Sequence, residues 1–469
     1  MTPAKPTVAS KYQRARELSG CAQDAPAAPA SDTPAPSAPQ RDQLRLRCVC
    51  RDRVTAIPAR LEDLLPADHL ARLIWERVVR LDLTAFYAPI VVVIGGPGQA
   101  ATDPQILVAL WLYALSQGVT SARELNALCV EHLAYIWLCG GVSMNYHTLR
   151  DFRVQHLQAL ADLLTQVVVC LDQAGLIAYE HTAQDGMRVR ASAGAASFRR
   201  EATLEKRLVE ARAAVAALTA PPAAETAARS AREQAAQERA AAERVARLEA
   251  ALAELPAAQA AKPAAKQADA RVSTTDPEAR VMKMADGGFR PAYNFELATD
   301  SAHRVIVGVD VTNAGSDKAE MAPMIDQVQE RTAQLPDDWL MDGGFVSQAA
   351  VATGTAKGVR SLAPVPQPQD PTRDPAVPLA TDSPAVAAWR ARMATEEAKL
   401  TYKLRAATRE CVNAQARSRH GLLQLRVRGL VKALAIALWI AITHDLLIWL
   451  RHLATPTISS PAAARAAAA

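Results

Sequence analysis

Apolar positions recur with two different periods along this chain, and the periods predict separate helical and strand-containing blocks. From residue 66 to residue 175 the spacing of apolar residues is helical. Asp103-Pro104 has the composition of a helix start, and Gly118 is a natural helix end. We expect helices at 105–116, 122–138 and 145–175. Such short helices could form a helix-turn-helix-like DNA-binding module or a plain helical bundle.

Strand-like alternation follows this block. At residues 187–191, apolar residues alternate with Arg188 and Arg190, which is the period of two that a strand requires. Asp185 and Gly186 directly precede the alternation. An Asp-Gly pair is common in hairpin turns, so a turn aspartate is one interpretation. If Asp185 instead lies in a strand in apolar surroundings, it needs a partner, a metal or water, because burying a lone carboxylate is costly.

Residues 198–270 are rich in Ala, Arg, Glu and Gln, and they predict a helical insertion. One or two long helices are expected, broken near Pro221-Pro222 and near Pro256. The apolar stripe is thin and based on alanine. The insertion could therefore be an antiparallel hairpin, an oligomer contact, or a mostly solvated charged segment.

Beyond the insertion, the order of elements predicts an α/β domain. Residues 289–298 and 304–312 form a hairpin pattern, and a helix capped at Ser316-Asp317 should run to about 334. A short buried strand at 339–345 contains Asp342. A helix, a strand and then a long helix without a breaker from 385 to Gly421 follow. This order favours a mixed sheet with helices on its faces.

Two aspartates stand out in that order. If their strands are parallel neighbours, Asp185 and Asp342 lie at the carboxyl ends of the strands, where α/β proteins form their sites. Other acids have simpler interpretations: Asp286 and Asp300 fit turns, and Asp317 fits a helix cap.

The third acidic candidate is Glu410, in the long helix. At about 100° per residue, one face of that helix carries Tyr402, Arg405, Arg409, Glu410, Asn413 and Arg417. This face could simply be solvated. Three converging carboxylates, however, suit divalent ions such as Mg²⁺, which prefers oxygen ligands. Two such ions can stabilise the attacking and leaving oxygens of a phosphodiester, and the arginines could hold DNA phosphates.

Composition narrows the class of protein only slightly. The chain has 469 residues, is 50% hydrophobic and carries a net charge of +5, which permits a polyanionic partner without requiring one. Seven cysteines without a C-x-x-C pair suggest reduced thiols in the cytoplasm. Residues 430–450 are apolar, but Lys432, His444 and Asp445 interrupt them. The remaining run is too short to span a bilayer, so we expect a buried helix and no membrane.

These segments together resemble a known family. The stretches TAQDGMRVRASAG, VMKMADGGFRPAYNFELATD, WLMDGGF and YKLRAATRECVN, with LPADHLARLIW and ATDPQILVALWLYALSQGVTSARELNALC before them, occur in the order of bacterial insertion-sequence transposases of the DDE class. The resemblance covers about residues 45 to 452. It implies an enzyme that cleaves and joins DNA strands at the ends of an insertion sequence.

The resemblance also implies roles for individual residues. Asp185, Asp342 and Glu410 would be the catalytic triad that binds Mg²⁺, with Mn²⁺ able to replace it. Tyr402 and Arg405 match a Tyr–Arg–Glu–Lys pattern on the last acidic helix. Glu410 lies one residue further along than the usual spacing, and Arg417 stands where Lys is usual. Arg405, Arg409 and Arg417, with Tyr402, would contact DNA.

The implied architecture is a ribonuclease H-like mixed sheet flanked by helices, made of residues 176–197 and 271–452. A helical DNA-binding domain at 41–175 precedes it, and residues 198–270 interrupt it. The leader 1–40 and the tail 453–469 are expected to be disordered. The implied partners are double-stranded DNA at terminal inverted repeats, target DNA and a second copy of the chain, giving a homodimer. Two alternatives stay open: a decayed transposase that only binds DNA, and a general nuclease.

Overall fold

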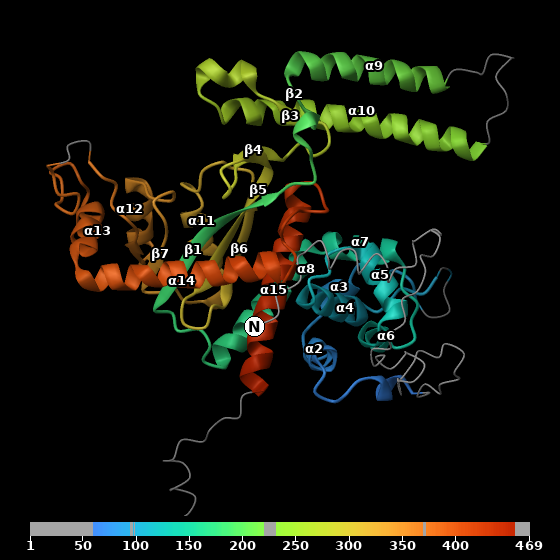
Figure 1. Ribbon diagram of the computed structural model, residues 1–469, viewed down its shortest axis with the longest axis horizontal. Coiled ribbons are helices and arrows are strands. Elements are labelled where there is room, and N and C mark those ends of the chain that lie inside the picture. The colour runs from blue at the N-terminus through green and yellow to red at the C-terminus, as the bar shows by residue number, and fades with distance from the viewer. Residues whose placement is uncertain (1–59, 94–96, 98, 220–230, 369–371, 455–469) are drawn as a thin grey trace, which may run out of the picture. The chain divides into compact units, whose positions relative to one another are not determined.

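The computed structural model describes residues 60–93, 97, 99–219, 231–368 and 372–454 (Figure 1). The chain divides into two compact units after Ile57, and all described residues lie in the second unit. The predictions for residues 1–40, for the break near Pro221-Pro222 and for the tail beyond Ala454 lie outside the described residues.

The block before Gly175 is helical, as its periodicity predicts. Its elements are η2 (Leu61–Leu64), α2 (Leu70–Val78), α3 (Thr84–Tyr87), α4 (Pro104–Ser116), α5 (Ala122–Glu131), α6 (Leu133–Cys139), α7 (Tyr146–Gln155) and α8 (Leu157–Gln173). The side chain of Asp103 accepts a hydrogen bond from the backbone N–H of Gln105, which confirms the predicted start of α4.

Two of the predicted helices are each split by a histidine. His132 separates α5 from α6, and its side chain accepts a hydrogen bond from the N–H of Ala134. His156 separates α7 from α8. Neither break is marked by Gly or Pro, so local sequence did not reveal it.

The second block contains a six-stranded mixed sheet flanked by helices. Its strands are β1 (His181–Arg190), β4 (Arg280–Lys283), β5 (Phe289–Asp300), β6 (Ile306–Thr312), β7 (Asp338–Leu340) and β8 (Arg360–Leu362). β5 pairs antiparallel with β1, and both β4 and β6 pair antiparallel with β5. β1, β7 and β8 pair in parallel, so the sheet is mixed and the protein is of the α/β class.

Asp185 and Gly186 lie in the middle of β1, opposite Leu297 and Glu296 of β5. The turn interpretation is therefore wrong, and the alternation that follows belongs to one continuous strand. On the other side of β1, the last residue pair with β7 is Ala183 with Leu340. Asp185 and Asp342 each lie two residues beyond that pair. They therefore occupy equivalent positions on adjacent parallel chain segments.

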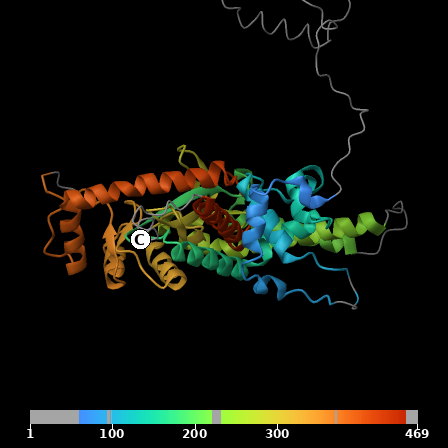
Figure 2. The same cartoon turned by 90° about the horizontal axis from the view of Figure 1, so that it is seen from below.

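Four helices accompany these strands: α11 (Met321–Thr332), α12 (Gln348–Ala356), α13 (Pro384–Ala394) and α14 (Glu396–Ser418). The sequence predicted one unbroken helix from 385, but Thr395 divides α13 from α14 and accepts a hydrogen bond from the N–H of Ala398. α14 contacts β1 and β5 and lies along the sheet (Figure 2). This position brings the α14 side chains to Asp185.

The last helix, α15 (Leu430–Ala454), lies in the core. By length and composition it could cross a membrane, but 83% of its apolar window is buried in the protein. Its polar residues have partners: Asp445 accepts a hydrogen bond of 2.9 Å from the N–H of Ile306, and His444 lies 2.9 Å from the carbonyl of Arg304. The prediction of a buried helix is confirmed, and α15 extends through the first two residues of the expected tail.

The insertion contains two long helices, α9 (Glu201–Thr219) and α10 (Ala231–Ala260), which lie side by side in Figure 1. Gln259 bonds to Glu201 and Arg212 pairs with Glu249, so the helices are antiparallel. The predicted break at Pro256 is wrong, because α10 continues through it. Leucines and alanines form a small core between the helices. A short ladder of β2 (Phe198–Arg199) and β3 (Val272–Ser273) closes the insertion.

Candidate functional site

One cavity of about 440 Å³ lies beside the middle of β1 and receives residues from distant parts of the sequence. Its acidic residues are Asp185 on β1, Asp342 after β7, Glu410 on α14, and Asp317. Its basic residues are Arg188, Lys283, Arg409 and Arg417. The three predicted acids therefore line one cavity, together with a comparable number of cationic side chains.

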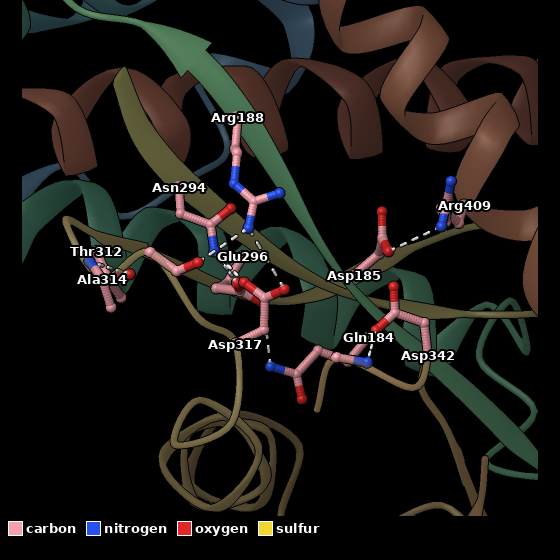
Figure 3. A network of polar contacts seen from close by, with 12 residues as sticks. Gln184, Asp185, Arg188, Asn294, Glu296, Thr312, Ala314, Asp317, Asp342 and Arg409 are labelled. Carbon is pink, nitrogen blue, oxygen red and sulfur yellow. Dashed lines mark hydrogen bonds and ion pairs between the residues drawn. The ribbon is translucent and has the colours of Figure 1, made fainter. Parts of the chain in front are cut away.

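The carboxylate of Asp185 is held by α14. Asn413 donates a hydrogen bond of 2.9 Å to Oδ2, and the guanidinium groups of Arg409 and Arg405 lie 3.2 and 3.4 Å from Oδ1 (Figure 3 shows the Arg409 contact). These three residues are four apart in sequence, so they share one face of the helix. That face points at the sheet, and the interpretation of a fully solvated face is wrong for these three positions.

Burial dominates the electrostatics of Asp185. The residue is only 7% exposed, and burial raises its pKa to about 6 despite the two nearby arginines, with the charge of Asp342 adding to the rise. At neutral pH the carboxylate is mostly ionised and paired with guanidinium groups. The ion pairs are themselves largely shielded from water, since the Arg405 side chain is mostly buried.

Glu410 lines the cavity but does not contact Asp185. It is exposed, and it forms no hydrogen bond or ion pair with any residue that the structure describes. It follows Arg409 directly, so its side chain is rotated by about 100° around the helix axis. The side chain of α14 that reaches Oδ1 of Asp185 is thus a guanidinium, while the third carboxylate lies elsewhere on the cavity wall.

Asp317 and Glu296 form a second set of acids that the sequence analysis did not identify. Asp317 was expected to cap a helix, but α11 begins only at Met321, so that prediction is wrong. Instead, Asn294 donates a hydrogen bond of 2.6 Å to Asp317, and Arg188 lies 3.9 Å from it (Figure 3). Burial raises the pKa of Asp317, and the Arg188 charge opposes that rise.

Glu296 is fully buried on β5, directly opposite Gly186. A Cβ atom at Gly186 would lie 2.6 Å from Oε1 of Glu296, so a side chain at this position would force the buried Glu296 carboxyl group to shift. Burial, together with the nearby charge of Asp317, raises the pKa of Glu296 to about 9. Glu296 is therefore protonated at neutral pH. A glutamate inside the apolar stretch FELA was the one sequence signal that could have drawn attention to it.

The predicted DNA contacts divide into two groups. Arg409 and Arg417 line the cavity. Tyr402 instead packs against a small apolar cluster that includes Ala183 and Leu340, and the Arg405 guanidinium lies 5.6 Å from its ring. Tyr402 thus supports Arg405, which in turn contacts Asp185.

In this structure two arginines, rather than a divalent ion, balance the charge of Asp185. Both carboxylate oxygens of Asp185 accept hydrogen bonds from α14, and two of the three donors are cations that would repel a metal ion. Across the described ranges, no three Asp, Glu, His or Cys side chains are placed to hold a metal ion. The oxygen donors are of the type that Mg²⁺ prefers. Asp185 would have to be released by the arginines before it could bind one.

Comparison with known proteins identifies the helical block. Residues 59–155 match the family model described as Transposase domain (DUF772). This match supports the predicted resemblance to transposases of the insertion-sequence type. No curated protein and no solved structure matches the chain. The matched segment ends before β1, so it does not include the cavity.

Proposed function

We propose that this protein is a DNA transposase of the DDE class, with a ribonuclease H-like catalytic domain that cleaves and joins DNA at the ends of an insertion sequence. One observation carries the proposal. Asp185, Asp342 and Glu410 are separated by 157 and 68 residues, by difference of their numbers, yet they line one cavity. The parallel pairing of β1 with β7, and the contact of β1 with α14, support the same assignment.

The basic residues of the cavity provide contacts for DNA. Arg188, Lys283 and Arg417 have guanidinium or ammonium groups that suit phosphate oxygens. A phosphate entering the cavity would compete with Asp185 for Arg405 and Arg409, because both are anions of similar geometry. DNA binding would thereby release the Asp185 carboxylate. Once Asp185 is released, Asp185, Asp342 and Glu410 would be the ligands of Mg²⁺, or of Mn²⁺ in its place.

The helices between residues 60 and 175 would recognise the terminal inverted repeats. This block carries the transposase-domain match, and it contains several short helices joined by tight turns. A homodimer would bring two ends of one element together, and the target DNA would then enter the same cavity.

Cleavage of the DNA that flanks the protein's own gene tests the proposal. Purified wild-type protein with Mg²⁺ or Mn²⁺ should cut at the element ends, and Asp342→Asn should lower the rate at least about a hundredfold. Asp286→Asn is the matched control, because Asp286 also begins an Asp-Gly-Gly stretch but lies in an exposed turn paired with Arg290. Equal cleavage by wild type and Asp342→Asn would refute the catalytic role of this cavity.

The arginine contacts favour a second candidate, a transposase-derived protein that binds DNA without cutting it. The observation behind it is that Arg409, rather than an acid, reaches Asp185. Wild-type protein that binds the element ends but never cuts them with either ion would establish this alternative. Cutting without preference for the ends would instead indicate a general nuclease.

A further inference from the structure

A second cavity, of about 390 Å³, is lined almost entirely by cationic and hydroxyl side chains. Arg207 comes from α9, and Arg244 and Arg247 come from α10. Arg428 comes from the segment just before α15. Thr274 and Thr275, which follow β3, complete the polar wall, and Leu248 is the single apolar residue among those that line it. We refer to these four arginines and their cavity as the arginine pocket.

The arginines of this pocket differ from their neighbours in lacking acidic partners. Elsewhere in and beside the insertion, Arg200 pairs with Asp269, Arg212 with Glu249 and Arg280 with Glu254. In contrast, none of the four pocket arginines forms an ion pair with a carboxylate in the part of the chain that the structure describes.

Asp276 is a buried acid whose electrostatics respond to the charge of Arg428. It is fully buried and accepts hydrogen bonds from the Tyr293 hydroxyl and the N–H of Gly429. Burial raises the pKa of Asp276, and the charge of Arg428 opposes this rise without a direct hydrogen bond. Asp276 therefore does not neutralise the three arginines on the insertion helices.

We propose that the arginine pocket binds the phosphate backbone of duplex DNA. The proposal rests on the proposed function only in taking DNA as the partner. Four guanidinium groups from three separate segments line one cavity, and together they create a positive potential that attracts an anion. The planar fork of a guanidinium matches the oxygens of a phosphate, and Arg244 and Arg247 are one turn apart on the same helix face.

The lining also limits the kind of ligand. Leu248 is the one apolar side chain among the described residues that line the cavity, so the cavity offers little to a hydrophobic ligand. These described lining residues include no carboxylate or amide side chain that could read base edges. The contacts would therefore be to phosphates and independent of DNA sequence. The insertion would position the duplex, while recognition of the ends would remain with other parts of the protein.

The test compares two double variants of the full-length protein. Arg244→Ala with Arg247→Ala removes two charges from the pocket, and Arg200→Ala with Arg212→Ala removes two charges from paired arginines of the same insertion. Alanine is a strong helix former, so both pairs should leave the helices intact, which circular dichroism will check. Fluorescence anisotropy with a short labelled duplex of mixed sequence, at several salt concentrations, gives the affinities.

The pocket variant should bind the duplex at least about tenfold more weakly than wild type. Its plot of log affinity against log salt should be shallower by up to about 2, which corresponds to two lost phosphate contacts. The control pair should change both quantities much less. Equal losses in the two variants, no loss in either, or a wild-type protein that does not bind duplex DNA would each overturn the proposal.

Two further measurements separate the possible sources of failure. Thermal unfolding with inorganic phosphate tests whether the ligand is a small anion. If phosphate stabilises wild type but not the pocket variant, and the pocket variant still binds DNA as tightly as wild type, the pocket binds small phosphates and the DNA proposal is overturned. Cleavage assays report independently on the Asp185 cavity. A protein that binds DNA through the pocket but never cuts it would refute the catalytic proposal while leaving this one intact.

Discussion

The guanidinium of Arg409 lies 3.2 Å from the carboxylate of Asp185, across the boundary between α14 and β1. This contact decides which side chain of α14 reaches the strand. Glu410, one residue further along, lines the same cavity but makes no contact with Asp185. The charge of Asp185 is thus balanced by arginine.

Changing Arg409 to Glu should introduce a divalent-ion site beside Asp185. Without ions the variant should be less stable than wild type, because two carboxylates would face each other in a buried place. Adding Mn²⁺ should raise the melting temperature of the variant by several degrees. An ion present at a hundred times its dissociation constant stabilises the folded state by about 2.7 kcal/mol. Arg409→Gln is the control, since it removes the cation without adding an acid. Identical responses of wild type and both variants to Mn²⁺ would rule out this effect.

Glu296→Gln should change how stability depends on pH. In the folded protein the pKa of Glu296 is about 9, against an ordinary value of 4.5. Between these values the unfolded chain releases the proton while the folded protein retains it, so wild type loses stability as pH rises from 4.5 to 9. Glutamine has no proton to release. The unfolding free energy of Glu296→Gln, relative to that of wild type, should therefore increase by up to about 1.4 kcal/mol per pH unit and level off above pH 9. Urea unfolding at pH 5 and pH 8 measures the difference, which a structural effect alone would leave constant.

Gly186→Ala should destabilise the protein by about 1–3 kcal/mol, as overpacking does in a filled interior. The new methyl group would approach Oε1 of Glu296 to 2.6 Å and Oδ1 of Asn294 to 2.9 Å. Gly194→Ala serves as the control, because nothing lies within 4 Å of a Cβ there and no left-handed backbone is involved. Thermal unfolding of both variants gives the comparison. A cost at Gly186 no larger than at Gly194 would show that the side chains of Glu296 and Asn294 can move aside.

Asp445→Ala should cost about 1–3 kcal/mol, because the buried N–H of Ile306 would lose its acceptor. Burial raises the pKa of Asp445 well above its ordinary value, which favours the uncharged form of the carboxyl group. Asp445→Asn keeps an acceptor oxygen and the neutral charge, and it should remain close to wild type. Chemical unfolding at pH 7 distinguishes the two. Equal losses would mean that the hydrogen bond to β6 is unimportant and that only the shape of the side chain matters.

Local patterns in the sequence correctly predicted most individual elements. The alternation after Gly186 indicated β1, the Asp103-Pro104 pair indicated the start of α4, and the apolar stretch before Leu450 indicated a buried helix. These predictions depend on residues near one another in the chain, whose periodicity and capping chemistry are local properties. The sequence also singled out Asp185, because a carboxylate in an apolar strand is costly without a partner.

Only the tertiary structure decided which of these side chains meet. The parallel pairing of β1 with β7 places Asp185 and Asp342 in the same register, and local periodicity contains no information on strand neighbours. Asp317 followed the pattern of a helix cap but is held near the cavity by Asn294 and Arg188.

Sequence and tertiary structure divide most clearly in what each determines about α14. Its sequence determined that arginines and an acid share an arc, whereas packing against β1 decided that Arg409 and not Glu410 reaches Asp185. Neighbouring positions on a helix differ by about 100° in direction, so the rotation at which the helix packs decides whether a cation or an anion reaches the strand.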